Sequence, residues 1–208
     1  MLPSSTDLLV LNGLRLKGFV ETAPLGMFLD MPYVDVERRL QEAAEKGHTL
    51  YRDGGRSGWS LTADGRREHD RLLAAELDSV NRRADMEAVY REFLDLNRQM
   101  LEICTRWQVT DQENQVLNDH LNEAYDQAVI AELKEIDFAV QPMCAVLGSW
   151  FGRFSSYGPR FSLALKKLSE GHNDWFTKPT IDSYHTVWFE LHEDLLVTLG
   201  IDRASERV

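Results

Sequence analysis

Polar side chains recur at regular spacing among apolar residues in the C-terminal half of the chain. Several of them are seven residues apart, which places them on one side of a helix at about 100° per residue. A buried amide or carboxylate without a partner costs about 1–3 kcal/mol. We therefore expect these groups to bond to one another or to a molecule that enters the helical core. The residues are Asn97, Asn118, Tyr125, Glu132, His185 and His192.

Three interpretations fit this polar stripe. It can be an internal hydrogen-bond network that fixes helix register, or an effector pocket with an aromatic lining. It can also be a metal site built from His185, His192 and Glu132, with Asp119 or His120. The spacing differs from H-E-x-x-H and E-x-x-H, so we predict no metal. The predicted effector-binding residues are Asn97, Asn118, Tyr125, Glu132, Tyr184, His185, Trp188 and His192; Trp107, Trp150, Phe154 and Trp175 complete the predicted lining.

Motifs of enzymes are absent from the sequence. It holds no G-x-G-x-x-G, no P-loop, no G-x-S-x-G and no cysteine cluster. In the tripeptide His192-Glu193-Asp194 the two carboxylates project toward the polar arc of their helix, which indicates a solvated acidic face. We predict that the chain is not an enzyme and needs no cofactor. A catalytic role for Glu132 remains an open alternative.

Charge is unevenly distributed along the 208 residues, whose net charge is −11. Residues 1–75 hold ten Lys and Arg against eleven Asp and Glu, whereas residues 76–208 hold thirteen against twenty-three. Any contact with nucleic acid is therefore expected from the N-terminal part. Cys104 and Cys144 are predicted to be reduced and buried, which favours the cytoplasm. No apolar run is long enough for a membrane span, and MLPSSTDLLV lacks the basic start of a secretory signal, so we expect neither feature.

The N-terminal residues predict three helices, a hairpin and a fourth helix. We expect a first helix capped by Asp7 and ended by Gly18, a short helix over 23–29, and a third helix over 32–46. The extended segments HTLYR and GWSLT flank the glycine-rich DGGRS, which indicates a β-hairpin. Thr62 then begins another helix. This order is that of a winged helix-turn-helix, which we place at residues 1–80, with the hairpin as its wing.

The run VERRLQEAAEKGHTLYRDGGRSGWSLTADGRRE resembles the MarR-type winged-helix transcription regulators, in which an L-T-x-x-G-R segment follows the hairpin. The resemblance implies that the helix over 32–46 enters the DNA major groove and that the wing lies along the backbone. The predicted DNA-binding residues are Tyr33, Arg38, Arg39, Arg52 and Arg56. Because the third helix also carries four carboxylates, a winged helix that binds protein instead of DNA is the alternative.

Residues 81–208 predict an α-helical bundle for effector binding and dimerisation. Helices are expected over 86–107, from a capping box at 110–113 to 138, from Pro142 to 154, over 158–168, and over 181–199 with Gly200 after its end. In the second of these, the predicted inward face includes Leu117, Leu121, Ala124, Ala128 and Ile136.

A second resemblance extends over the chain. The blocks CTRWQV, NDHLNEAYDQAVI and SYHTVWFELHEDLLVTLG are similar to segments of actinobacterial MarR-like regulators, and to segments appended to pyruvate, phosphate dikinase-like enzymes. We therefore predict a mainly α, cytoplasmic, homodimeric transcription regulator that binds double-stranded DNA and responds to a small-molecule effector. The alternative is an allosteric, protein-binding module of a phosphoenolpyruvate-utilising enzyme.

Overall fold

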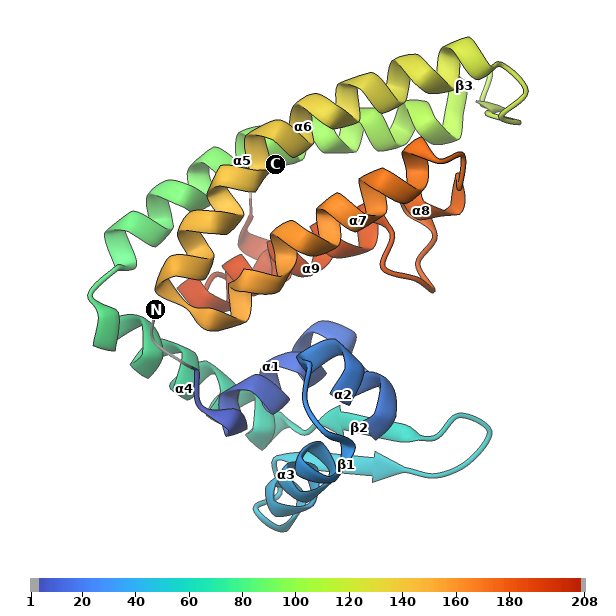
Figure 1. The fold of residues 1–208 in the computed structure, drawn as a ribbon. Coiled ribbons are helices and arrows are strands. Elements are labelled where there is room, and N and C mark those ends of the chain that lie inside the picture. Colours follow the sequence, from blue (N-terminus) through green and yellow to red (C-terminus); the bar gives the residue numbers. More distant parts are fainter. Residues whose placement is uncertain (1–3, 207–208) are drawn as a thin grey trace. The chain divides into compact units, whose positions relative to one another are not determined.

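In a computed structural model that describes residues 4–206, the chain is mainly α-helical (Figure 1). The described residues divide into two units. One holds residues 4–83 together with 193–206, and the other holds residues 84–192. The first is called the N-terminal unit below and the second the helical unit. No helix of the described residues is long and apolar enough to cross a membrane.

The elements of the N-terminal unit follow the predicted order. They are α1 (Thr6–Lys17), α2 (Thr22–Leu29), α3 (Tyr33–Glu45), β1 (Thr49–Arg52), β2 (Gly58–Leu61) and α4 (Ala63–Val80). The prediction that Asp7 caps α1 is wrong. Ser5 is the cap, because its Oγ accepts a hydrogen bond from the amide of Leu8 at 3.2 Å.

The hairpin is held on both sides of its second strand. β1 and β2 pair antiparallel, with Thr49 opposite Leu61 and Arg52 opposite Gly58. On the other side of β2, Trp59 exchanges two backbone hydrogen bonds with Val20, at 2.8 and 3.1 Å. β2 also supplies part of the core that packs α1, α2 and α3 together, whose buried members are Val10, Leu11, Leu14, Leu25, Val36, Leu40, Trp59 and Leu61.

The L-T-x-x-G-R segment joins the hairpin to α4 through close contacts. The Oγ1 of Thr62 accepts from the amide of Gly65 at 2.9 Å and donates to the carbonyl of Gly47 at 2.6 Å. The amide of Thr62 donates to the carbonyl of His48 at 3.0 Å. A Cβ placed on Gly65 would lie 1.9 Å from that carbonyl oxygen. Glycine is therefore required for packing here, in a residue with ordinary helical backbone.

Residues 193–206 contribute polar contacts to the N-terminal unit. Asp194 is buried, and its Oδ1 accepts from the Nδ2 of Asn12 at 3.4 Å. The Oδ1 of Asn12 lies 2.9 Å from the Nε2 of buried His69. Glu193 forms an ion pair with Arg15 at 2.7 Å. The prediction of a solvated acidic face at residues 193–194 is therefore wrong for Asp194, because its side chain is buried and bonded to Asn12 of α1.

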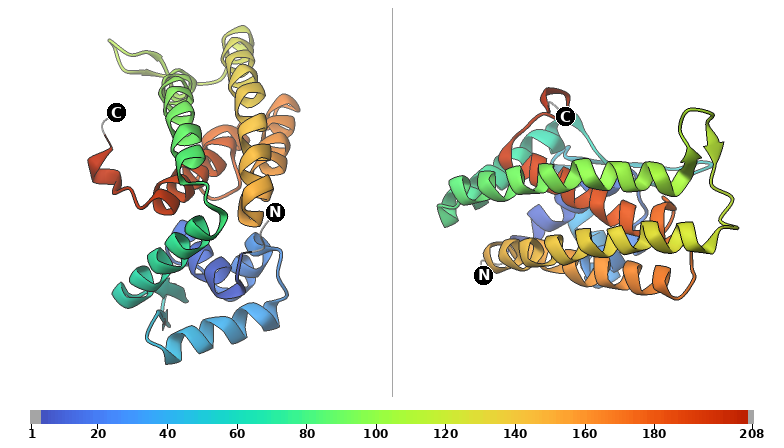
Figure 2. Two further views of the ribbon diagram at one scale, coloured as in Figure 1. Left: turned by 90° about the vertical axis from the view of Figure 1, so that its left-hand side faces the viewer. Right: turned by 90° about the horizontal axis from the view of Figure 1, so that it is seen from above.

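The helical unit is built around two long helices that run side by side from a small hairpin (Figure 2). Its elements are α5 (Arg83–Gln108), β3 (Val109–Asp111), β4 (Val116–Leu117), α6 (Glu123–Trp150), η1 (Gly152–Ser156), α7 (Tyr157–Ser169), α8 (Asp174–Thr177) and the first part of α9 (Tyr184–Leu199). A short helix η2 (Arg203–Ser205) follows α9 and belongs to the N-terminal unit.

The predicted capping box at 110–113 is a hairpin turn. The Oδ1 of Asp111 accepts from the amides of Glu113 and Asn114, which bends the chain back between β3 and β4. Helix α6 starts twelve residues later at Glu123, where Asn122 caps the amide of Tyr125. The predicted inward positions Leu117 and Leu121 are accordingly outside any helix, and they are 74% and 85% exposed.

Two further predicted helix boundaries are wrong. Pro142 lies inside α6 and is exposed, on the side where the carbonyl that it leaves without a partner can face solvent. The last helix begins at Tyr184 instead of Ile181. Ser183 determines this start, because its Oγ accepts from the amide of Thr186 at 3.3 Å.

Aromatic rings fill the centre of the helical unit. Phe93 of α5 stacks on Trp188 of α9 with centroids 4.9 Å apart, and Phe161 of α7 lies 4.8 Å from the ring of Tyr184. Both cysteines are free and buried, as predicted, and burial raises the pKa of the Cys104 thiol to about 12. The bundle core thus consists mainly of packed aromatic and aliphatic side chains.

The contact at Gly65 gives a prediction for stability. Gly65→Ala should lower the free energy of unfolding by about 2–4 kcal/mol, because the added methyl group meets a backbone oxygen that cannot turn away. Alanine in a helix otherwise stabilises by up to about 1 kcal/mol, so the sign of the change is diagnostic. Urea denaturation measures it.

The control is Gly55→Ala at the hairpin tip, where a Cβ meets open space. Equal unfolding midpoints for the two variants would contradict the packing role of Gly65.

Candidate functional site

The predicted recognition helix α3 presents a mixed surface to solvent. Tyr33 and Val34 at its start are exposed, followed by Arg38, Gln41 and Glu45. Arg38 is held by two carboxylates of the same helix, with Asp35 at 3.2 Å and Glu42 at 3.4 Å. Its charge is therefore balanced locally.

Arg39 points to a different neighbour. Its Nη1 lies 3.3 Å from Asp7 of α1 and 2.9 Å from Glu42. The side chain is more enclosed than that of Arg38, and it lines a pocket between α1 and α3. The structure thus separates these two predicted DNA-binding arginines, with Arg38 at the surface and Arg39 against α1.

The hairpin carries the other two predicted DNA-binding arginines. Arg52 ends β1 and Arg56 lies in the turn, and both are exposed. Neither forms an ion pair with any described residue. The turn itself is closed by Asp53, whose Oδ1 accepts from the amide of Gly54 at 2.9 Å and from the hydroxyl of Ser57 at 3.1 Å. The carboxylate of Asp53, which lies between the two arginines in the sequence, therefore bonds within the turn.

The stretch from Lys46 to Arg67 is locally basic in an acidic chain. It holds five Lys and Arg against two Asp, a net charge of +3. Asp64 is paired with Arg67 in the first turn of α4. Lys46, Arg52, Arg56 and Arg66 have no ion pair with a described residue, so they form the part of the N-terminal unit that is able to attract phosphate.

Some predicted effector-binding residues of the helical unit are paired with one another. The Oδ1 of buried Asn97 accepts from the indole Nε1 of Trp188 at 2.9 Å. The ring of His192 lies 5.1 Å from that of Phe93. The hydroxyl of Tyr184 donates to Asp137 at 3.2 Å. These contacts join α5, α6 and α9 through internal bonds.

The predicted stripe of Asn118, Tyr125 and Glu132 does not exist as one face. Asn118 precedes α6 and donates to the carbonyl of Trp107 and to Asp126. Tyr125 donates from its hydroxyl to the carbonyl of Arg106 at 2.9 Å. Glu132 is exposed and forms an ion pair with Arg106, which lowers the pKa of its carboxyl group.

Two histidines considered for a metal site, His185 and His120, have surroundings of another kind. His185 is half-buried, and burial lowers its pKa. His120 packs on Trp107 with centroids 4.5 Å apart and bonds to Asp126 at 2.9 Å. Among residues 4–206, no group of three or more His, Cys, Asp or Glu is arranged to hold a metal ion.

Comparison of the chain with protein-family models, with curated proteins and with solved structures gives no match. The resemblance to MarR-type regulators therefore stays a prediction. A functional assignment depends on the geometry and charge of this chain's own residues.

Two partly buried polar clusters of the helical unit are missing from the sequence predictions. Asp137 accepts from Tyr184 and also from the Nε2 of Gln141 at 3.1 Å. In the other, Arg160 contacts Asp182 at 2.9 Å and buried Glu190 at 2.5 Å. Each cluster ties a residue of α6 or α7 to the region around α9. Both have the form of internal networks that fix the position of that helix.

The sequence holds a weak signal for these clusters. Arg160 lies between the apolar positions Tyr157, Phe161 and Ala164, on the same side of a predicted helix. Asp137 likewise lies between Ile136 and Val140 at helical spacing. A search for seven-residue repeats alone overlooks such single polar residues.

Partial burial of Asp137 predicts an effect of pH. Removal from water raises the pKa of its carboxyl group, although two hydrogen bonds oppose the shift. The folded state then binds a proton more readily than the unfolded state, so this group contributes more stability as pH falls from 7 toward about 4. Asp137→Asn should gain stability relative to the wild type at pH 7, and the gain should shrink at lower pH.

Urea denaturation at two pH values measures this difference. Glu135→Gln is the matched control, since it removes an exposed carboxylate from the same helix. A gain that is constant over pH, or that grows on acidification, would refute the assignment to Asp137.

Proposed function

We propose that this chain is a transcription regulator whose N-terminal unit binds double-stranded DNA as a winged helix. The element order supports the proposal, because three helices, a two-stranded hairpin and a fourth helix follow one another as in that fold. The observation that carries it is the local charge of +3 between Lys46 and Arg67, with arginines at the hairpin tip that no described carboxylate neutralises.

In this proposal the hairpin provides most of the affinity. Arg52 and Arg56 contact phosphates, while α3 presents Tyr33, Val34 and Gln41 to the base edges. A Gln side chain suits adenine and an apolar side chain suits the methyl group of thymine. Because Arg38 is already paired with carboxylates, its contribution to phosphate binding is small. Binding should accordingly depend strongly on salt and only moderately on sequence.

The proposal does not place an effector among the predicted residues of the helical unit. Asn97, Trp188 and Tyr184 bond within the protein, and Glu132 bonds to Arg106. Homodimerisation and a cytoplasmic location remain part of the proposal as predicted from the sequence.

A salt titration tests the proposal directly. Affinity for a mixed-sequence labelled duplex is measured by fluorescence anisotropy between ~50 and ~200 mM salt. Four unpaired cations in the basic stretch give an expected slope of about −3 to −4 per copy in a plot of log affinity against log salt. Arg56→Ala should reduce that slope by about one unit.

Lys134→Ala is the control, because it removes an exposed cation of the helical unit that has no ion-pair partner among the described residues. No binding at ~50 mM salt would end the DNA proposal.

The carboxylate shared by the arginines of α3 gives a further prediction. Glu42→Gln releases both Arg38 and Arg39 from one partner, so DNA affinity at low salt should rise by about threefold to tenfold. Glu45→Gln removes the same charge from α3 without releasing an arginine, since Glu45 has no ion pair with a described residue. Equal gains for the two variants would show that only net charge matters.

A protein-binding function is the second candidate. A groove between α2 and α3 is lined by residues that include Gly26, Met27, Pro32 and Tyr33, and Val34 follows Tyr33 in the sequence. Met27 is 84% exposed and Val34 is 73% exposed. Such exposed apolar side chains favour a protein partner if the salt titration finds no DNA binding.

A further inference from the structure

The exposed side of α6 changes character along the helix. Its first half presents charged residues, among them Glu132, Lys134 and Glu135. Over residues 136–150, all of which the structure describes, no exposed side chain is charged; the exposed residues are Phe138, Ala139, Pro142, Ala145, Val146 and Ser149. These six residues are called the α6 patch below. Phe138 is 81% exposed. An uncharged patch with an exposed aromatic ring is typical of an interface between proteins.

A groove lies beside the α6 patch, between α6, η1 and the start of α7. Its volume is about 280 Å³, and its lining is mostly small: Gln141, Cys144, Ala145, Gly148, Ser155, Gly158 and Pro159. A Cβ on Gly148 would lie 3.1 Å from the Cα of Ser155, so glycine lets η1 approach α6 closely. An apolar cavity of about 150 Å³ can hold benzene, so the groove has room for one phenyl ring.

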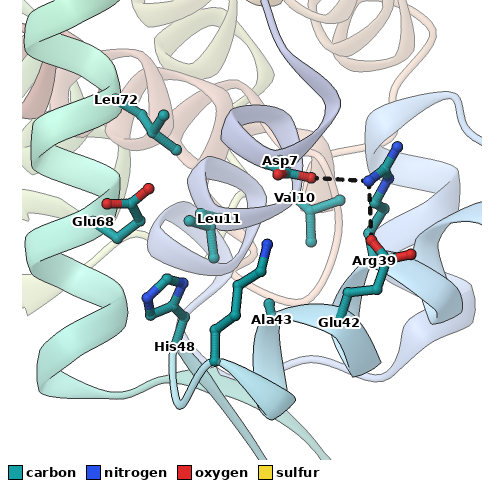
Figure 3. A pocket seen from close by; sticks show the side chains of 10 residues that line it. Asp7, Val10, Leu11, Arg39, Glu42, Ala43, His48, Glu68 and Leu72 are labelled. Carbon is teal, nitrogen blue, oxygen red and sulfur yellow. Dashed lines mark hydrogen bonds and ion pairs between the residues drawn. The ribbon is translucent and has the colours of Figure 1, made fainter.

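The lining of the groove suits an apolar occupant. None of its seven residues is charged, whereas five of the ten residues that line the pocket of the N-terminal unit are charged (Figure 3). The Nε2 of Gln141 donates to Asp137 and to the carbonyl of Gly158, at 3.1 and 3.2 Å. The hydroxyl of Ser155 donates to the carbonyl of Gly152 at 2.6 Å. These polar groups have partners within the helical unit, so they do not require a polar ligand.

The α6 patch and the groove complement each other in two copies of the chain. Phe138 and Ala145 are seven residues apart, so they lie on the same side of α6, about 10 Å apart along its axis. When two copies of α6 lie antiparallel about a two-fold axis between residues 141 and 142, Phe138 of each copy faces Ala145 of the other. Both rings then enter a groove together, which gives the self-complementary contact of an isologous dimer.

Charge also favours this side of the helical unit. Each copy has a net charge of −11, so two copies repel each other wherever acidic surfaces meet. The exposed residues of α5 include five carboxylates and three arginines, a net charge of −2. The α6 patch places no carboxylate opposite its symmetry mate, so two copies can approach there without this repulsion.

We propose that the α6 patch is the interface of a homodimer, in which Phe138 of each copy fills the groove of the other. The inference rests on the proposed function for the homodimer, and it adds the surface on which the two copies meet. The patch and the groove together supply twelve residues. A standard stable interface has roughly 20–30 residues a side, so we expect a weak dimer with a Kd of about 10–100 μM.

Sedimentation equilibrium of the full chain, without DNA, measures the Kd between ~5 and ~500 μM protein. Phe138→Ala should weaken association at least about thirtyfold, as expected for a central aromatic anchor. Leu121→Ala is the matched control, because Leu121 is 85% exposed in the same unit but lies outside α6, and its Kd should stay unchanged. Phe138 is exposed, so its variant should keep the urea midpoint of the wild type. Because no DNA is present, failure of the dimer is distinguished from failure of DNA binding.

A mixture of two variants tests the exchange of rings. Phe138→Ala keeps the groove, whereas Ala145→Gln keeps the ring and places a longer side chain at the edge of the groove. Each variant alone loses both contacts, but a pair made of one copy of each regains one contact. An equimolar mixture should therefore contain more dimer than either variant alone.

Four results would each overturn the proposal. They are a wild type that is monomeric at ~500 μM, an unchanged Kd in Phe138→Ala, an equal loss of association in Leu121→Ala, and a mixture with no more dimer than its components.

Discussion

Pairing of charges is the constraint on which the proposed activities of the chain depend. In a chain with this many carboxylates, most arginines of the described helices lie beside an acidic residue, as Arg38 lies beside Asp35 and Glu42. Those pairs are largely exposed, so each adds little to stability. Their larger effect is that a paired cation is neutralised, so only the unpaired cations can bind an anion from outside the protein. The arginines of the hairpin and Lys46 are unpaired among the described residues.

The N-terminal unit could be predicted well because its signals are local. Proline at the start of α3, glycine after its end, and threonine before α4 each act within one turn of the chain. Gly65 shows the limit of such reasoning. In the sequence, Gly65 is predicted as part of the L-T-x-x-G-R motif. The structure shows that a larger residue would clash with the carbonyl oxygen of His48, which lies beside Gly65 only after the hairpin has folded.

The helical unit could be predicted less well because long-range bonds override local patterns. The segment 110–113 satisfies the formula of a capping box, but the side chain of Asp111 binds the following amides and forms a turn instead. Pro142 is tolerated in mid-helix because it faces solvent. For the polar residues, periodicity identified Asn97 as buried but could not assign Trp188 as its partner, since the two are 91 positions apart.

The two backbone hydrogen bonds between Val20 and Trp59 determine where the hairpin is attached to the rest of the unit. β2 is hydrogen-bonded on both edges at Trp59, one residue from the turn end of the paired strands, whereas beyond Gly58 the turn is shaped by the bonds of Asp53. The strands of the hairpin are therefore attached to the core, whereas its turn extends beyond that attachment. The turn can adjust to the curvature of a bound surface without disturbing the aromatic and aliphatic contacts of the strands.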